Sequence, residues 1–234
     1  LLLLVPAVQA AEVQVAVAAN FAAPMERLAG AFAAATGHAL KTSSGATGKF
    51  HSQIRAGAPF EVLLAADDET PRRLVEEGHA VAGTAFTYAI GRLVLWSAQP
   101  GLVDEQGAVL AGGGFGKLAI ANPKVAPYGA AAMQVLKARG LADAVAPRLV
   151  TAESIGQAYQ FAVTGNADLA FVALSQVAVP GKAPVGSQWL VPQSLHGEIR
   201  QDAVLLKAGE KNPAAAALLA WLKSPAAKAV IQSY

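Results

Sequence analysis

The sequence of 234 residues contains no cysteine. This absence excludes a thiol nucleophile, a disulfide framework and a cysteine-ligated metal site. Charged residues make up only 15% of the chain, and the net charge is +2. There is no cluster of Lys and Arg of the kind that nucleic-acid-binding proteins use, so we expect no nucleic-acid partner. With 54% hydrophobic residues, the chain is instead expected to bury a sizeable core, in one large domain or in two lobes.

Long apolar runs are also scarce, and the informative one is N-terminal. The apolar stretch Leu1–Val5 precedes Val8-Gln9-Ala10, which places small residues at the −3 and −1 positions of a signal-peptide cleavage site. The run is too short for a membrane-spanning helix, which needs about 18 residues. We interpret residues 1–10 as the remnant of a signal peptide. Because Ala11 rather than a cysteine follows, we expect a soluble, unlipidated protein that is periplasmic where the source has two membranes.

Strand and helix patterns alternate along the chain. Apolar runs predict strands at 13–17, 40–43, 60–65, 93–96, 117–121, 168–172 and 203–206. Helices are predicted between them at 23–35, 49–55, 130–138, 154–163 and 213–222. This alternation predicts an α/β fold with mainly parallel sheets and helices on both faces. The segment 182–200 mixes Pro, Gly and polar residues, so we expect a loop or a link between lobes there.

Small-residue loops precede several of the predicted helices. The loop 44–49, Ser-Gly-Ala-Thr-Gly-Lys, lacks the first Gly and the final Ser or Thr of a nucleotide-binding phosphate loop, which argues against a nucleoside triphosphatase. It still runs into a helix start, where unpaired N–H groups and the helix dipole favour an anion. The pattern recurs at Asn20, at Tyr128-Gly129 and at Ser154-Ile155. Because such loops lie at the carboxyl ends of strands, the sequence predicts an anion site built from neutral donors.

Enzyme chemistry has weaker support. The four histidines, His38, His51, His79 and His196, lack metal-ligand spacing, and we expect each at the surface. The one dense acidic group is Asp67-Asp68-Glu69, which a turn into a helix starting at Thr70-Pro71 explains more simply. An exported α/β enzyme that uses Asp67 or Asp68 is therefore kept as an alternative.

Seven segments in this order resemble the periplasmic molybdate-binding proteins of ABC importers: 15–21, 45–59, 65–67, 119–123, 126–129, 152–155 and 171–175. The resemblance implies a two-lobe binding protein with two chain crossovers, closing over its ligand. Lobe 1 would comprise residues 11–89 plus 201–234, and lobe 2 residues 90–200. The implied ligand is molybdate. Tungstate is so similar in size that the sequence does not distinguish the two ions. The implied partner is the membrane permease of the importer, and neither enzymatic activity nor a cofactor is expected. We expect a monomer.

The resemblance also implies particular ligand-binding residues. Asn20 matches a residue that donates from side chain and backbone, with Ala19 beside it. Thr47 matches a hydroxyl donor, while Tyr128 and Ile155 match backbone N–H donors. Where some members carry a Tyr phenol, this chain has Ala173, so the number of side-chain donors stays open. Sulfate, phosphate or an organic acid is the alternative ligand, although a carboxylate would usually require an Arg fork, which these loops lack.

Overall fold

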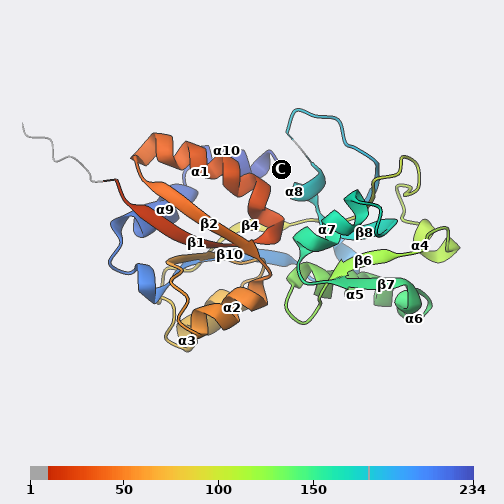
Figure 1. Cartoon of the computed structure of the whole chain (residues 1–234), viewed down its shortest axis with the longest axis horizontal. Helices are drawn as coiled ribbons and strands as arrows, with labels where there is room; N and C mark the ends of the chain where they lie inside the picture. Colours follow the sequence, from red (N-terminus) through yellow and green to blue (C-terminus); the bar gives the residue numbers. More distant parts are fainter. Residues whose placement is uncertain (1–9, 179) are drawn as a thin grey trace, which may run out of the picture.

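The computed structural model describes residues 10–178 and 180–234, and it contains two five-stranded sheets that lie side by side (Figure 1). The first sheet has the order β2-β1-β3-β10-β4. Its strands are β1 (Glu12–Ala18), β2 (Ala39–Gly45), β3 (Val62–Leu64), β4 (Phe86–Gly91) and β10 (Ile199–Leu205). Strand β1 is parallel to β2 and β3, whereas β10 is antiparallel to β3 and β4. The predicted signal-peptide remnant, residues 1–10, lies outside the described residues except for Ala10.

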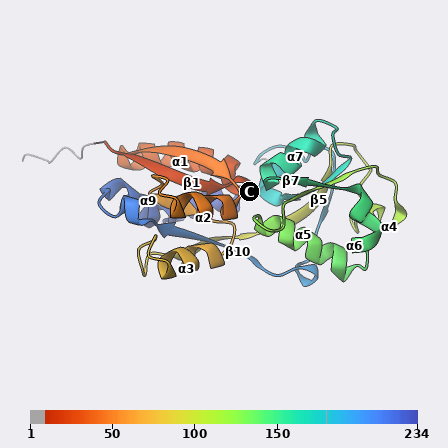
Figure 2. The same ribbon diagram turned by 60° about the horizontal axis from the view of Figure 1, so that its bottom comes forward.

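The second sheet has the order β7-β6-β8-β5-β9. Its strands are β5 (Leu93–Ser97), β6 (Leu118–Ala121), β7 (Leu149–Ala152), β8 (Leu169–Ala173) and β9 (Ser187–Leu190). Strand β6 is parallel to β7 and β8, while β5 is antiparallel to β8 and β9. The chain passes from the first sheet to the second between β4 and β5, and it returns between β9 and β10. These two passages join the halves that Figure 2 shows next to each other along the long axis.

Helices cover both faces of each sheet (Figures 1 and 2). Around the first sheet they are α1 (Ala22–Thr36), α2 (Thr47–Arg55), α3 (Glu69–Glu76), α9 (Pro213–Leu222) and α10 (Pro225–Gln232). Around the second they are α4 (Val109–Gly112), α5 (Pro127–Ala138), α6 (Ala142–Val145), α7 (Ile155–Val163) and α8 (Leu174–Val177). No single described helix is long and apolar enough to cross a membrane. Helices α9 and α10, which are bent by 62° relative to each other, reach that length and apolar composition only when taken together.

The alternating side chains of the strands explain the two layers of helices. Val13, Val15 and Val17 of β1 point into a core that α1, α9 and α10 complete. Ala16, on the opposite face of the same strand, packs in a second core with α2 and α3. A central parallel strand buried on both faces is therefore apolar almost without interruption. The second sheet repeats the arrangement, with α5 against one face and α7 against the other.

Local sequence signals set several helix ends. Helix α1 stops where Gly37 adopts a φ of 75° and its N–H bonds the Ala33 carbonyl oxygen, a conformation that glycine takes without a Cβ penalty. Pro127 opens α5, because its ring presets the helical φ and its missing N–H costs nothing in the first turn. The α5 helix therefore begins three residues earlier than the predicted start at 130, and Tyr128 lies inside its first turn.

Two other sequence predictions are corrected by the structure. The segment 182–200 is not only a loop, because it contains β9 (Ser187–Leu190). The last strand starts at Ile199 rather than at 203, since β10 also pairs with β4 across a register shift between Gln201 and Asp202. Both errors have the same cause. Polar residues in these strands hide the apolar pattern that marks a strand in sequence.

Candidate functional site

A small pocket lies where the two halves meet. Its described lining residues come from four segments that lead into helices and from Ala66 after β3, and they are Ala18, Ala19, Asn20, Gly45, Ala46, Thr47, Ala66, Ala126, Pro127, Tyr128 and Ile155. The space between atoms in this pocket, open solvent included, is about 210 Å³, compared with about 1270 and 1370 Å³ in two wider grooves. All five residues that the sequence predicted as ligand-binding thus line one pocket. Its size suits a small ion rather than an extended organic molecule.

Asn20 follows β1 in a 3-10 turn, Ala19–Phe21, that leads directly into α1. Its side chain is only 2% exposed. The Nδ2 atom lies 2.6 Å from Oε1 of Gln201, and the Oδ1 atom is buried without a hydrogen-bond partner. The backbone oxygen of Asn20 accepts a hydrogen bond from the Ser175 hydroxyl, which belongs to the other half. An unpaired buried polar atom is costly, and in this orientation the unpaired atom is an acceptor, which an oxyanion could not satisfy.

Thr47 is the first residue of α2 and is 1% exposed. Its hydroxyl oxygen accepts a hydrogen bond from the Ala66 backbone N–H at 3.0 Å. A hydroxyl has one proton as well as its lone pairs, so the O–H remains available to donate. The contact with Ala66 holds the hydroxyl at the pocket wall with its proton free for a ligand.

The second half contributes two helix starts. Tyr128 is the second residue of α5, and Ile155 is the first residue of α7, which Ser154 caps through the Gln157 N–H. N–H groups in a first helical turn have no partner within the helix. The helix dipole makes the same end favourable for negative charge. Two such ends therefore meet two from the first half at one pocket.

Ala173 lies at the end of β8, is fully buried and carries no donor in its side chain. Its backbone N–H donates to Oε1 of Gln176, whose Nε2 in turn donates to the Ile155 carbonyl oxygen at 3.2 Å. Gln176 thus holds the start of α7 in place. The phenol that the resemblance allowed at this position is absent from the pocket, and a structural glutamine supports the backbone donor instead.

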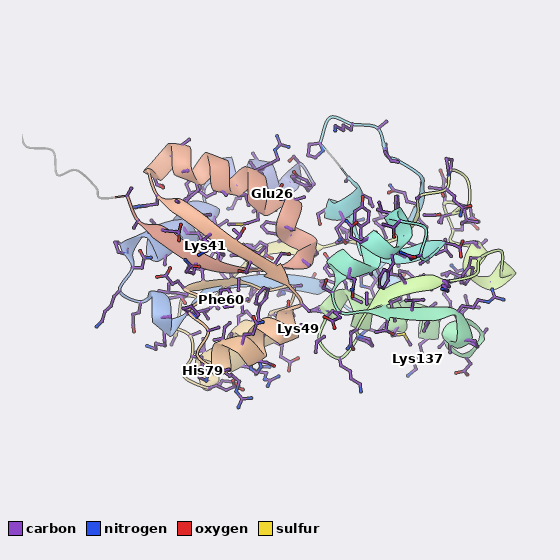
Figure 3. All side chains as sticks on the ribbon, viewed as in Figure 1. Glu26, Lys41, Lys49, Phe60, His79 and Lys137 are labelled. Atoms are coloured by element: carbon purple, nitrogen blue, oxygen red, sulfur yellow. The ribbon has the colours of Figure 1, made fainter. Side chains whose placement is uncertain are left out.

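No ionised side chain occurs among the described residues that line the pocket. Lys49, at the junction of the halves in Figure 3, is about half exposed and pairs with Glu153 instead. The pair crosses between α2 and the loop before α7 and lowers the pKa of the Glu153 carboxyl. Oriented backbone and side-chain dipoles can replace water around an anion without a countercharge. The pocket has the chemistry of a neutral-donor anion site.

Behind Asn20 lies a buried polar group that the sequence did not indicate. Tyr88 and Gln201 belong to β4 and β10, and Tyr128 reaches them from the second half. Burial raises the pKa of both phenols, although hydrogen bonds with Asn20 and Gln201 oppose this for Tyr128. Both phenols are neutral hydroxyls at physiological pH. No local motif could have revealed Gln201, because it lies 181 residues from Asn20 along the chain.

The acidic group has a structural role. Asp67 accepts hydrogen bonds from the Thr70 N–H at 2.8 Å and from the Thr70 hydroxyl at 3.2 Å. Helix α3 begins at Glu69 after Asp68, whose side chain makes no cap hydrogen bond, so the Asp67 carboxylate rather than Thr70 satisfies an N–H of the first turn. Burial raises the pKa of Asp67, and the bonds from Thr70 oppose that shift. Both carboxylate oxygens of Asp67 are used as a helix cap, so the enzyme alternative loses its main support.

The prediction of surface histidines is wrong for three of the four. His38, His51 and His196 are buried, while His79 is partly exposed. His51 Nε2 lies 3.0 Å from the Glu77 carboxylate. Partial desolvation alone would raise the pKa of Glu77, but His51 and the nearby Arg55 and Arg73 lower it overall. Within the described ranges, no group of three or more His, Asp or Glu side chains could hold a metal ion.

Comparison with known proteins places the chain in a family. A family model described as bacterial extracellular solute-binding protein matches residues 13–234. The chain belongs to this family. The fold predicted from the sequence is confirmed by the two sheets flanked by helices and by the match to a solved binding-protein structure. The relatives named below are binding proteins, which agrees with the expectation of a role without catalysis.

Curated relatives match nearly the whole of this solute-binding protein. The molybdate-binding protein ModA of Azotobacter vinelandii is 61% identical over 232 residues, which cover 99% of this chain and 92% of the relative. ModA of Rhodobacter capsulatus is 52% identical over 225 residues, covering 96% of this chain and 88% of the relative. The solved structure of the periplasmic molybdate-binding protein of Azotobacter vinelandii superposes with a TM-score of 0.92 at 46% identity, covering 94% of this chain and 96% of that one.

Proposed function

We propose that this solute-binding protein captures molybdate for an ABC importer and delivers it to the membrane permease. The observation that carries the proposal is the small pocket of neutral donors, formed by four helix starts and lined by Asn20 and Thr47. The high identity to relatives named for molybdate binding supports the choice of ligand. Tungstate is expected to bind as well, because it has the same shape and charge and nearly the same size.

The binding step forms and breaks no covalent bond. The dianion would accept hydrogen bonds from the Asn20 amide, the Thr47 hydroxyl and the backbone N–H groups of Tyr128 and Ile155. Ala19 would pack beside it or add a further N–H. Hydrogen bonds to an ionised acceptor are roughly twice as strong as neutral ones, and exclusion of water strengthens them further. A rigid donor set favours the oxyanion whose size fits, so sulfate and phosphate, which are smaller, are expected to bind more weakly.

The proposed lobes are residues 11–89 plus 201–234 and residues 90–200. Three described contacts join them around the pocket. The Gly48 N–H donates to the Val125 carbonyl oxygen at 2.9 Å, Lys49 pairs with Glu153, and Ser175 bonds the Asn20 backbone. A Cβ at position 48 would lie 3.0 Å from Val125 Cα, so glycine allows the lobes to approach this closely. These contacts support closure over a bound ion.

Export to the periplasm follows from the family, whose members are extracellular, and from the apolar N-terminal segment. We propose that residues 1–10 are a signal-peptide remnant, that the mature protein carries no lipid, and that it works as a monomer. A size-exclusion measurement with and without molybdate tests the last point.

Isothermal titration calorimetry tests the proposed ligand. The purified protein would be titrated with molybdate, tungstate, sulfate and phosphate under identical conditions. We expect tight, single-site binding of molybdate and tungstate and much weaker binding of the other two. The Asn20→Ala variant removes a donor to a desolvated dianion, so it should lose about 1.5–3 kcal/mol of binding, roughly 10- to 150-fold. Tight sulfate binding, or no molybdate binding, would refute the assignment.

A further inference from the structure

Four polar side chains form a buried group behind the pocket, and their hydrogen bonds constrain one another. The group consists of Asn20, Tyr88, Tyr128 and Gln201. Asn20 and Tyr128 also line the pocket itself, and all four residues line one of the wider grooves on the other side. The oxygen and nitrogen of a side-chain amide exchange places by a half-turn about the last bond, so their partners decide which is which. The inference below rests on the proposed function, in which Asn20 contacts the oxyanion.

Tyr88 determines the orientation of Gln201. Its hydroxyl lies 2.9 Å from the Ala65 carbonyl oxygen and 3.3 Å from Oε1 of Gln201. A backbone carbonyl can only accept a hydrogen bond, and a phenol has one proton. When that proton is given to Ala65, the phenol oxygen can only accept from Gln201. The amide atom of Gln201 that faces Tyr88 must then be the nitrogen.

The orientation of Gln201 determines that of Asn20. The same amide atom of Gln201 lies 2.6 Å from the Asn20 amide. A nitrogen there donates to Asn20, which must present its oxygen in return. The Asn20 nitrogen then takes the position in which the structure has a buried oxygen without a partner. An unpaired acceptor becomes a free donor, which is the group that an oxyanion requires.

Tyr128 supports the same orientation. Burial raises the pKa of its phenol, and donation from the side-chain amides of Asn20 and Gln201 lowers that pKa in part. In the amide orientation that the structure has, a nitrogen of each residue faces the phenol. The phenol oxygen then accepts hydrogen bonds, but neither amide offers an acceptor for the phenol proton. After both half-turns it faces amide oxygens and can donate. A Cβ at Gly91 would lie 3.0 Å from Gln201 Nε2 and would collide with the Tyr128 hydroxyl, so these groups are held closely together.

We propose that Gln201 is a positioning residue for the ligand site. It holds the Asn20 amide with its nitrogen toward the bound oxyanion and its oxygen away, and Tyr88 holds Gln201 in turn. Without this constraint the Asn20 amide can turn its oxygen toward the dianion, where the two acceptors repel each other. Gln201 thus acts on affinity through Asn20 and not through a contact of its own.

A double-mutant cycle on molybdate affinity tests the proposal. The variants are Asn20→Ala, Gln201→Met and the double variant, with calorimetry as the assay and circular dichroism to verify folding. Gln201→Met keeps the length of the side chain and removes its hydrogen bonds. The matched control is Gln134→Met, which removes a glutamine hydrogen bond to the Gly197 N–H away from the pocket. If Gln201→Met does not fold, Tyr88→Phe replaces it in the same cycle.

We expect Gln201→Met to weaken molybdate binding by about 3-fold or more, up to the loss in Asn20→Ala, because residues in one network couple. In the Asn20→Ala background the same change should alter affinity by less than about 2-fold, and Gln134→Met should have no effect. Fully additive losses, or no loss in Gln201→Met, would overturn the positioning role and leave the proposed function intact. Wild-type protein that binds no molybdate would overturn both.

Discussion

Replacing Thr47 by Val separates two roles of one hydroxyl. The side chain is buried, and its oxygen accepts the Ala66 N–H while its proton is free for the ligand. Val has nearly the same shape but neither hydrogen bond. Loss of a donor to a dianion should cost about 1.5–3 kcal/mol of binding, roughly 10- to 150-fold in the Kd for molybdate. Loss of the acceptor leaves the Ala66 N–H unpaired, which costs about 1–3 kcal/mol of folding free energy.

The two losses are measured separately. Calorimetric titration of the folded variant with molybdate gives the binding loss. Thermal unfolding without ligand gives the stability loss, which should lower Tm by about 2–4 °C per kcal/mol for a chain of this length. Thr47→Ser keeps the hydroxyl and is the control, with affinity close to wild type. An unchanged affinity in Thr47→Val, or an equal loss in Thr47→Ser, would refute the assigned role of the hydroxyl.

Three further predictions follow from contacts outside the ligand position. Gly91→Ala places a Cβ against the Tyr128 hydroxyl and should cost about 1–3 kcal/mol through overpacking, measured by urea unfolding; unchanged stability would show that the hydroxyl can move. Lys49→Met and Glu153→Gln should each change molybdate affinity by only a few-fold, because the ion pair between these residues is exposed. Any change in affinity should disappear at high salt. A large loss that does not depend on salt would contradict this expectation. Because its neighbours lower the pKa of Glu77 below the ordinary 4.5, its stabilising contribution is present above that pH and is lost as the pH falls further. In Glu77→Gln, the free energy of unfolding should therefore decrease less steeply as the pH is lowered through this range. An unchanged pH dependence would count against the ion pairs.

The α/β alternation and most helix ends could be predicted because their causes are local. From Val15 onward, strand β1 is buried on both faces and is apolar without interruption. The α1 helix ends at a glycine with positive φ, and α9 begins at a proline after a capping asparagine. The four helix-start loops were recognisable for the same reason, since each is a short segment with its own composition. Parallel strands bring the two loops of each half to one edge of its sheet, but the two pairs meet at one pocket only because the two halves face each other.

Other features depend on contacts between distant segments, and sequence patterns do not carry them. Gln201 meets Asn20 only because β10 returns to the first sheet beside β3 and β4. The buried histidines were mistaken for surface residues because their partners, such as Glu77 for His51, lie far away in the chain. The molybdate assignment came from a resemblance, whereas the residues alone reached only an anion held by neutral donors.

A crystal structure of the protein with molybdate, with the ion located by the anomalous signal of molybdenum, tests the central claim most directly. We expect one strong peak in the pocket between the halves. The oxyanion should lie within hydrogen-bonding distance of the Asn20 amide, the Thr47 hydroxyl and the backbone N–H groups of Tyr128 and Ile155. A peak in one of the wider grooves, or an oxyanion held by Lys or Arg side chains, would contradict the account.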